Sequence, residues 1–178
     1  MELIQLTSDY DLKPFDCGDA DLNGFLLNDA KTFLEKRLGK TFLLLDNEEI
    51  VAYCCLFNDK ISKLEMSNGA WRKVKKVFPH RKHFSSYPAI KIGRFAVSKD
   101  YKGKGLGSEF MTTIKYILDR EENHSTFRFL TVDAYLSAIP FYERNDFQML
   151  LSEDIDRHTR MMYFGGRNLN CVSKEKYY

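Results

Sequence analysis

Three glycines alternate with lysines immediately before a segment with helical periodicity. The stretch YKGKGLGSEFM carries Gly103, Gly105 and Gly107, with Lys102 and Lys104 interspersed. Glycine leaves backbone N–H groups uncovered, and the N–H groups at the start of a helix attract anions. A tight turn with incidental glycines is the alternative interpretation. The number of glycines, the two lysines and the strand–turn–helix setting favour a loop that binds an anion such as a phosphate.

Spacing excludes the two commonest phosphate-binding motifs. A P-loop requires G-x-x-x-x-G-K-[ST], and this string does not occur in the chain. The dinucleotide-binding motif requires G-x-G-x-x-G within an early strand–helix–strand unit, whereas the glycines here are spaced G-x-G-x-G. Neither of these two motifs therefore explains the glycine loop.

The composition is that of an ordinary globular protein. The chain has 178 residues, of which 44% are hydrophobic and 29% charged, so we expect a single domain over residues 1–178. No apolar run approaches the roughly 20 residues of a membrane helix, and no signal-peptide pattern is visible, so we expect a cytoplasmic location and no membrane partner. The net charge of +2 is too small to indicate nucleic-acid binding by itself.

The four cysteines have no spacing typical of a metal site or of disulfides. Cys54 and Cys55 are adjacent, which in a strand directs their side chains to opposite faces; the other two are Cys17 and Cys171. Reduced, buried thiols are predicted, and no bound metal.

In the first half of the chain, the hydrophobic pattern predicts a strand, a helix and a hairpin. Residues 1–6 form a candidate strand. Apolar residues recur at spacings of three and four over residues 19–38, with Asp19 as a candidate N-cap and Gly39 as a candidate stop. Two apolar runs within residues 41–57, separated by DNEE, predict a two-stranded hairpin.

A basic segment follows between Lys60 and His83, where eight Lys or Arg residues accompany a single acid, Glu65. Trp71, Val74 and Phe78 would share one face of a helix there. A solvated amphipathic helix and a basic binding surface explain this pattern equally well.

In the second half, strand and helix patterns alternate, which predicts a mixed sheet with helices on its faces. Pro140 is compatible with a short helix only in its first turn. The predicted elements are strands at 89–97, 127–134 and 157–165, and helices at 106–118 and 137–147.

The glycine loop and a later segment resemble the GNAT superfamily of N-acetyltransferases. YKGKGLGSEFM is similar to the acetyl-coenzyme A signature R/Q-x-x-G-x-G/A, with Lys102 where Arg or Gln is usual, then Gly105 and Gly107. LTVDAYLSAIPFYERNDF is similar to a later strand and a short helix with a Phe-Tyr pair, and the resemblance is strongest over residues 89–150. It implies an α/β fold whose central sheet is mixed, mostly antiparallel, splayed near its middle and flanked by helices. Acetyl-CoA is implied as the co-substrate, bound through its pyrophosphate at the glycines.

The resemblance also assigns individual residues. Tyr142 is implied as the general acid that protonates the CoA thiolate, although without the resemblance a tyrosine in this aromatic-rich chain belongs to the core more often than to a catalytic site. Asp146 stands where glycine is common in the family, and aspartate tolerates a left-handed turn. The implied cofactor-binding residues are Phe95, Ala96, Val97, Lys102, Gly103, Lys104, Gly105, Leu106, Gly107 and Ser108.

Gly93, inside the strand before the loop, has two interpretations. It could mark a bulge that releases an amide to polarise the thioester carbonyl, or it could reflect ordinary close packing.

No general base is obvious, since Glu65, Asp133 and His83 are candidates only by residue type. A lysine acceptor, with a pKa of about 10.4, must lose a proton before attack, whereas an α-amine of about 7.7–8.0 is already partly neutral. A site without a base would suit an α-amine better.

The opening FDCGDADLNGFLLNDA resembles one GNAT branch that includes toxins acetylating the amino acid on charged tRNA. This resemblance implies a tRNA substrate, contacted through the basic segment Arg72–Lys82, and an antitoxin partner, often a small ribbon-helix-helix protein. Homodimers are frequent in the family. Three functions are open: an N-acetyltransferase for a primary amine, the aminoacyl-tRNA toxin, and a non-catalytic CoA-binding interaction module.

Overall fold

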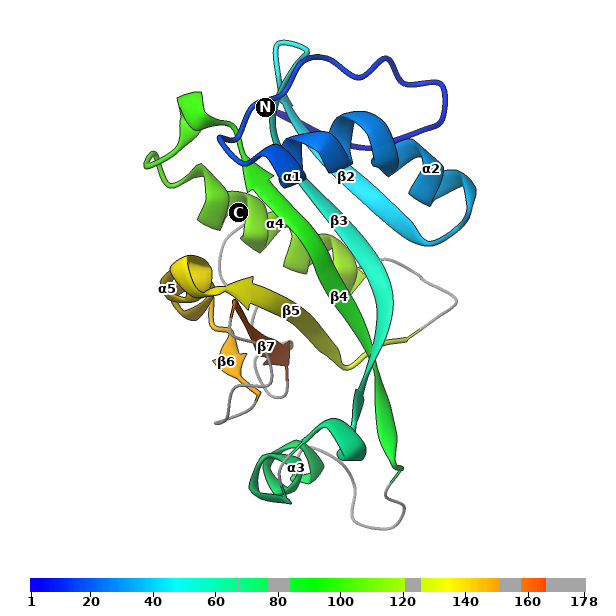
Figure 1. Ribbon diagram of the computed structural model, residues 1–178, viewed down its shortest axis with the longest axis vertical. Coiled ribbons are helices and arrows are strands. Elements are labelled where there is room, and N and C mark those ends of the chain that lie inside the picture. Colours follow the sequence, from blue (N-terminus) through cyan, green and yellow to red (C-terminus); the bar gives the residue numbers. More distant parts are fainter. Residues whose placement is uncertain (67, 77–83, 121–125, 151–157, 166–178) are drawn as a thin grey trace. The chain divides into compact units, whose positions relative to one another are not determined.

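The computed structural model describes residues 1–66, 68–76, 84–120, 126–150 and 158–165 (Figure 1). The strands are β1 (Glu2–Gln5), β2 (Gly39–Asp46), β3 (Glu49–Ser62), β4 (Ser86–Val97), β5 (Phe129–Tyr135), β6 (Gln148–Met149) and β7 (Thr159–Gly165). The α-helices are α1 (Ala20–Gly24), α2 (Ala30–Glu35), α3 (Asn68–Lys75), α4 (Leu106–Arg120) and α5 (Ile139–Arg144). A π-helical segment, Phe25–Asp29, connects α1 to α2.

The strands of the described residues form one sheet in the order β1-β2-β3-β4-β5-β7-β6. Antiparallel pairing joins β1 to β2, β2 to β3, β5 to β7 and β6 to β7. The predicted α/β fold with a mostly antiparallel sheet and flanking helices is confirmed. The splay of the sheet near its middle stays a prediction.

The chain divides into two compact units. The first consists of Met1–Asn58 with Ile92–Thr113, and the second of Asp59–Lys91 with Ile114–Tyr178. Because their sequences run across these boundaries, β3, β4 and α4 contribute residues to both units. The single domain expected over residues 1–178 stays a prediction.

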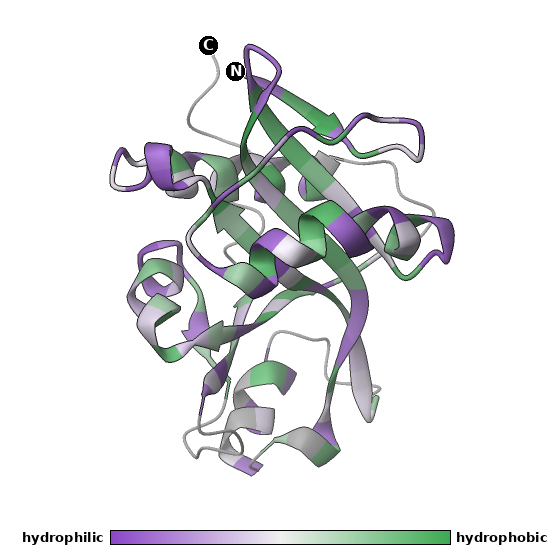
Figure 2. Ribbon diagram, turned by 45° about the horizontal axis from the view of Figure 1, so that its top comes forward, coloured by the Kyte–Doolittle hydropathy of each residue, from purple (hydrophilic) through white to green (hydrophobic). Residues whose placement is uncertain are grey.

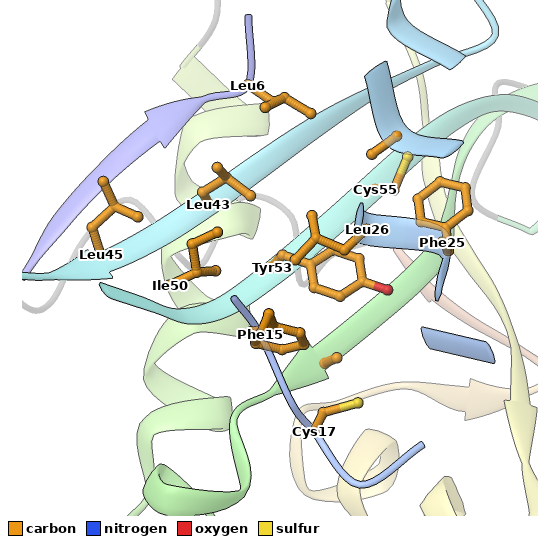
Figure 3. Close-up of a cluster of buried hydrophobic side chains, with 12 residues drawn as sticks. Leu6, Phe15, Cys17, Phe25, Leu26, Leu43, Leu45, Ile50, Tyr53 and Cys55 are labelled. Atoms are coloured by element: carbon orange, nitrogen blue, oxygen red, sulfur yellow. The ribbon is translucent and has the colours of Figure 1, made fainter. Parts of the chain in front are cut away.

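In the first unit, α1 and α2 lie across the β2–β3 hairpin (Figure 1). Both helices carry hydrophilic and hydrophobic residues (Figure 2). α2 buries Ala30, and Leu22 of α1 packs partly buried against the core cluster. The Tyr53 hydroxyl donates to the Leu22 carbonyl oxygen at 2.7 Å, which joins the hairpin to α1. The cluster between them, drawn in Figure 3, consists of Leu6, Phe15, Cys17, Phe25, Leu26, Ala30, Leu43, Leu45, Ile50, Tyr53, Cys55 and Ala96.

The predicted helix at 19–38 is present but ends earlier than expected. Asp19 is its N-cap, as predicted, with its carboxylate accepting from the N–H groups of the second and third residues after it. The stop at Gly39 is wrong, because α2 ends at Glu35 and Arg37 takes the left-handed conformation with φ 56°. Gly39 instead begins β2, where a Cβ would lie 2.6 Å from the Phe57 ring.

In the second unit, β5 pairs with β7 along its whole length, from Phe129 opposite Gly165 to Tyr135 opposite Thr159. α3 confirms part of the amphipathic prediction, since Trp71 and Val74 are buried at 4% and 2% exposure. Phe78 lies outside the described residues. A core cluster of this unit contains Ile61, Trp71, Val74, Tyr87, Ala89, Phe129 and Leu150.

Cys17, Cys54 and Cys55 are free and buried, as predicted, while Cys171 lies outside the described residues. Within the described ranges, no helix is both long and apolar enough to cross a membrane.

Candidate active site

The glycine loop has a backbone that only glycine adopts readily. Gly103 and Gly105 have φ values of +77° and +83°, in the left-handed region. No heavy atom lies within 4 Å of the position that a Cβ would occupy at either residue. The two glycines are therefore required by conformation rather than by crowding, and they leave an exposed stretch of backbone. Gly107 has no positive φ and lies in the first turn of α4.

α4 begins immediately after this loop. The Gly105 carbonyl oxygen accepts from Ser108 N at 3.0 Å and from Glu109 N at 3.3 Å, so Gly105 caps the helix. The N–H groups of the first helical residues have no carbonyl one turn earlier, and they carry the positive end of the helix dipole. Leu106 is 5% exposed and anchors the first turn in the core. An open glycine backbone at a helix N-terminus fits a pyrophosphate group.

The two lysines of the loop have different surroundings. The Lys102 ammonium donates to the Cys17 carbonyl oxygen, which connects the glycine loop to the segment before α1. The Lys104 ammonium lies 5.2 Å from the centroid of the Tyr101 ring, and the residue is exposed. Lys104 is thus better placed than Lys102 to supply charge to an anion on the loop.

Asp16 makes a second connection to the same region, which sequence reasoning missed. Its carboxylate accepts from Gly18 N at 2.8 Å, from the Asn23 side chain at 2.9 Å and from the Lys99 ammonium at 2.7 Å. The hydrogen bond from Lys99 is the main reason that the pKa of Asp16 lies well below its usual value. Lys99 N also donates to the Asp16 carbonyl oxygen at 3.0 Å. The segment before α1 is thereby held against the turn that leads into the glycine loop.

The side chains of Phe95 and Ala96 on β4 pack on opposite sides of the sheet. The Phe95 ring stacks on Phe110 of α4 with centroids 5.3 Å apart, whereas Ala96 is 5% exposed within the cluster of Figure 3. Val97 is half-buried. The Phe95 and Ala96 side chains are thus engaged in packing on the two sides of the sheet.

Gly93 has a direct packing explanation. A Cβ at this position would lie 1.9 Å from the nearest atom of the Phe57 ring, which covers the glycine. Among the two interpretations of Gly93, close packing is therefore the one with an observed contact.

Tyr142 lies on α5 in the second unit and is 6% exposed. Its ring makes edge-on contacts with Phe141 at 5.1 Å and with Phe147 at 5.4 Å between centroids. Its carbonyl oxygen accepts from the N–H groups of Asn145 and Phe147, each at 3.0 Å. These contacts fix the backbone and the ring of the residue implied as general acid.

Asp146 follows in the turn after α5 and has φ +63°. The left-handed turn expected from the family's usual glycine is confirmed.

Of the candidate bases, Asp133 has a side chain 43% exposed and forms an ion pair with Lys91. The Glu65 side chain and His83 lie outside what the structure describes.

Two cationic side chains become notable only in the structure. The Lys115 ammonium on α4 is buried in the second unit, and burial lowers its pKa to about 8. In the first unit, Arg94 donates to the Gly93 carbonyl oxygen at 2.8 Å, and its guanidinium lies 5.1 Å from the Phe25 ring centroid. No sequence motif assigns a role to either residue.

The sequence profile of the acetyltransferase (GNAT) family matches residues 2–147 of the chain. Solved structures with the same fold include a bacterial toxin, which is 15% identical with a TM-score of 0.83 over 99% of this chain and 97% of that one. A Tyr-to-Phe mutant of the toxin AtaT, bound to the C-terminus of the antitoxin AtaR and acetyl-CoA, is 16% identical with a TM-score of 0.76 over 98% of both chains. AtaT complexed with acetyl-methionyl-tRNAfMet is 20% identical with a TM-score of 0.77, over 96% and 98%.

The chain belongs to the acetyltransferase (GNAT) family. Family membership makes it an acetyltransferase, with acetyl-CoA as the acetyl donor characteristic of the family.

Proposed function

We propose that this enzyme transfers the acetyl group of acetyl-CoA directly to a primary amine, with Tyr142 as the general acid. The observation that carries the proposal is the glycine loop, in which Gly103 and Gly105 hold an open left-handed backbone at the start of α4 in a chain of the acetyltransferase family. In this proposal, the pyrophosphate of acetyl-CoA lies on that loop beside Lys104, and the pantetheine arm lies along the backbone of Phe95–Val97.

The chemistry requires one proton donor. The amine nitrogen attacks the thioester carbonyl carbon, a C–N bond forms, and the C–S bond breaks as the thiolate leaves. The Tyr142 hydroxyl donates a proton to the thiolate, the nitrogen releases its own proton to water, and the Tyr142 phenolate takes a proton back from water. The buried aromatic surroundings of Tyr142 limit the orientations of its ring and support this role.

A more specific acceptor, the α-amine of aminoacyl-tRNA, is favoured by the structural neighbours. AtaT, which has the same fold over nearly the whole chain, is complexed with acetyl-methionyl-tRNAfMet. An α-amine is partly neutral near pH 7, so it needs no strong base, and Asp133 is already paired with Lys91. Exposed Arg72 and Lys76 at α3 would contribute to phosphate contacts.

An antitoxin partner belongs to the same proposal. AtaT has been solved with the C-terminus of its antitoxin AtaR. If this chain is a toxin of that kind, its expression alone would arrest growth. Co-expression of the small antitoxin protein that binds it would relieve the arrest.

The decisive experiment measures transfer of labelled acetyl from acetyl-CoA to bulk charged tRNA, with simple amines and lysine-containing peptides in parallel. Label on aminoacyl-tRNA, lost in Tyr142→Phe, would support both the acceptor and the acid. Label on simple amines alone would redirect the proposal to a small-molecule or protein acceptor. Saturable heat on acetyl-CoA binding without transfer to any amine would contradict catalysis and favour the non-catalytic module.

A further inference from the structure

Lys115 is a buried charged side chain that the proposed chemistry does not use. It is 5% exposed, although lysine is almost never fully buried without a partner. The ion pairs among the described residues do not include it. Burial disfavours its charged form, and nearby Asp146 opposes that effect.

The ammonium of Lys115 is instead surrounded by aromatic rings and one carbonyl oxygen. It donates to the Asn145 carbonyl oxygen and lies 3.9 Å from the Phe164 ring centroid and 5.1 Å from that of Phe147. Contact with aromatic faces and a carbonyl satisfies a desolvated cation. These contacts restrict the orientation of the Lys115 side chain.

The residue that Lys115 holds is the one that closes α5. Asn145 N donates to the carbonyl oxygens of Phe141 at 3.2 Å and Tyr142 at 3.0 Å, and its side-chain amide donates to the Phe141 oxygen at 2.8 Å. Lys115 therefore connects α4, through a single carbonyl group, to the last turn of the helix that carries Tyr142.

The Phe147 ring provides a second connection between Lys115 and Tyr142. Phe147 contacts the Lys115 ammonium on one side, and its ring meets the Tyr142 ring edge-on at 5.4 Å. The Phe147 N–H also donates to the Tyr142 carbonyl oxygen at 3.0 Å. Both the backbone and the ring of Tyr142 are thus one contact away from groups that Lys115 touches.

We propose that Lys115 is a positioning residue for acetyl transfer, because it fixes the turn 145–147 against α4 and so sets the orientation of the Tyr142 ring. The inference rests on the proposed role of Tyr142 as general acid. A purely structural role is the competing explanation. An apolar side chain of similar volume would fill this space without the penalty of burying a charge. The stability of the folded protein alone therefore does not explain why position 115 is a lysine.

A double-mutant cycle separates the two explanations. Lys115→Met, Tyr142→Phe and the double variant are compared by kcat and by KM for acetyl-CoA, with Lys36→Met on an exposed site as the matched control. We expect Lys115→Met to lower kcat about tenfold with KM nearly unchanged in the wild-type background. In the Tyr142→Phe background we expect it to change the residual rate by less than about twofold. Lys115→Arg, which retains a cationic donor, should recover part of the rate.

The results of this cycle distinguish a failure of the positioning role of Lys115 from a failure of the general-acid role of Tyr142. If Tyr142→Phe is impaired but Lys115→Met lowers the rate by the same factor in both backgrounds, or leaves kcat unchanged in both, the positioning role is overturned and the general acid stands. If Tyr142→Phe keeps the wild-type rate, the general acid is overturned, and the role of Lys115 with it. Thermal unfolding checks each variant, and Lys115→Leu replaces Lys115→Met in the same cycle if the latter does not fold.

Discussion

At the scale of the residue, the glycine loop shows how backbone conformation alone selects an amino acid. Gly105 has φ +83° with open space around its missing side chain, so an alanine there is opposed by local strain and not by a clash. Gly107, two residues later, has an ordinary helical environment. The two positions form a natural pair for comparison.

We predict that Gly105→Ala lowers the free energy of unfolding by about 1–2 kcal/mol and weakens acetyl-CoA binding. Gly107→Ala should be neutral or slightly stabilising, because alanine is favoured in a helix by about 0.5–1 kcal/mol. Denaturant unfolding and calorimetric titration with acetyl-CoA measure the two effects. Equal stability losses in both variants would contradict the conformational explanation.

At the scale of the element, β4 packs against β3 where Gly93 of β4 faces the Phe57 ring of β3. Gly93 lies beneath Phe57, and Phe57 also contacts Phe33 of α2 at 5.7 Å between centroids. We predict that Gly93→Ala destabilises the protein by about 1–3 kcal/mol, because the ring is confined from the other side. In a Phe57→Leu background the same change should lose much of its effect. Additive losses in the double variant, measured by denaturant unfolding, would contradict the packing explanation.

The segment before α1 is the second element-scale feature. Asp16 accepts hydrogen bonds from Gly18, Asn23 and Lys99 and so holds this segment beside the glycine loop. We predict that Asp16→Ala weakens acetyl-CoA binding several-fold with a smaller effect on kcat. Asp11→Ala removes a carboxylate that is paired with Lys13 on the surface, and it serves as the control. Unchanged affinity in Asp16→Ala, measured by calorimetry, would show that the segment does not shape the loop.

At the scale of the whole molecule, the titration of Lys115 links pH to stability. Its pKa falls from 10.5 to about 8 on folding, so between these values the unfolded chain binds a proton that the folded chain has released. Stability contributed by this group therefore rises with pH across that window. We subtract the free energy of unfolding of Lys115→Met from that of the wild type. We predict that this difference increases by about 1 kcal/mol or more between about pH 7 and pH 9.5. Denaturant unfolding at both pH values measures it, and a constant difference would mean that the ammonium is not desolvated.

Local pattern determined most of the elements from the sequence. Alternating and helical periodicity located the β2–β3 hairpin, α4 and β7, and Pro140 correctly marked the first turn of α5. The stop at Gly39 was wrong, because Arg37 adopts the left-handed turn and the glycine serves packing against Phe57. β6, with two residues, is too short to leave a periodic signal.

For the candidate site, the sequence by itself determined the residues whose role follows from their own backbone or from a short motif. Gly103, Gly105 and Asp146 are of this kind, because a left-handed conformation restricts the amino acid at that position. Only the tertiary structure decided the contact of Asp16 with Lys99, 83 residues away, and that of Lys115 with Asn145, 30 residues away. No local pattern encodes such contacts, since they arise from the packing of elements that are distant in sequence and from the burial that packing imposes.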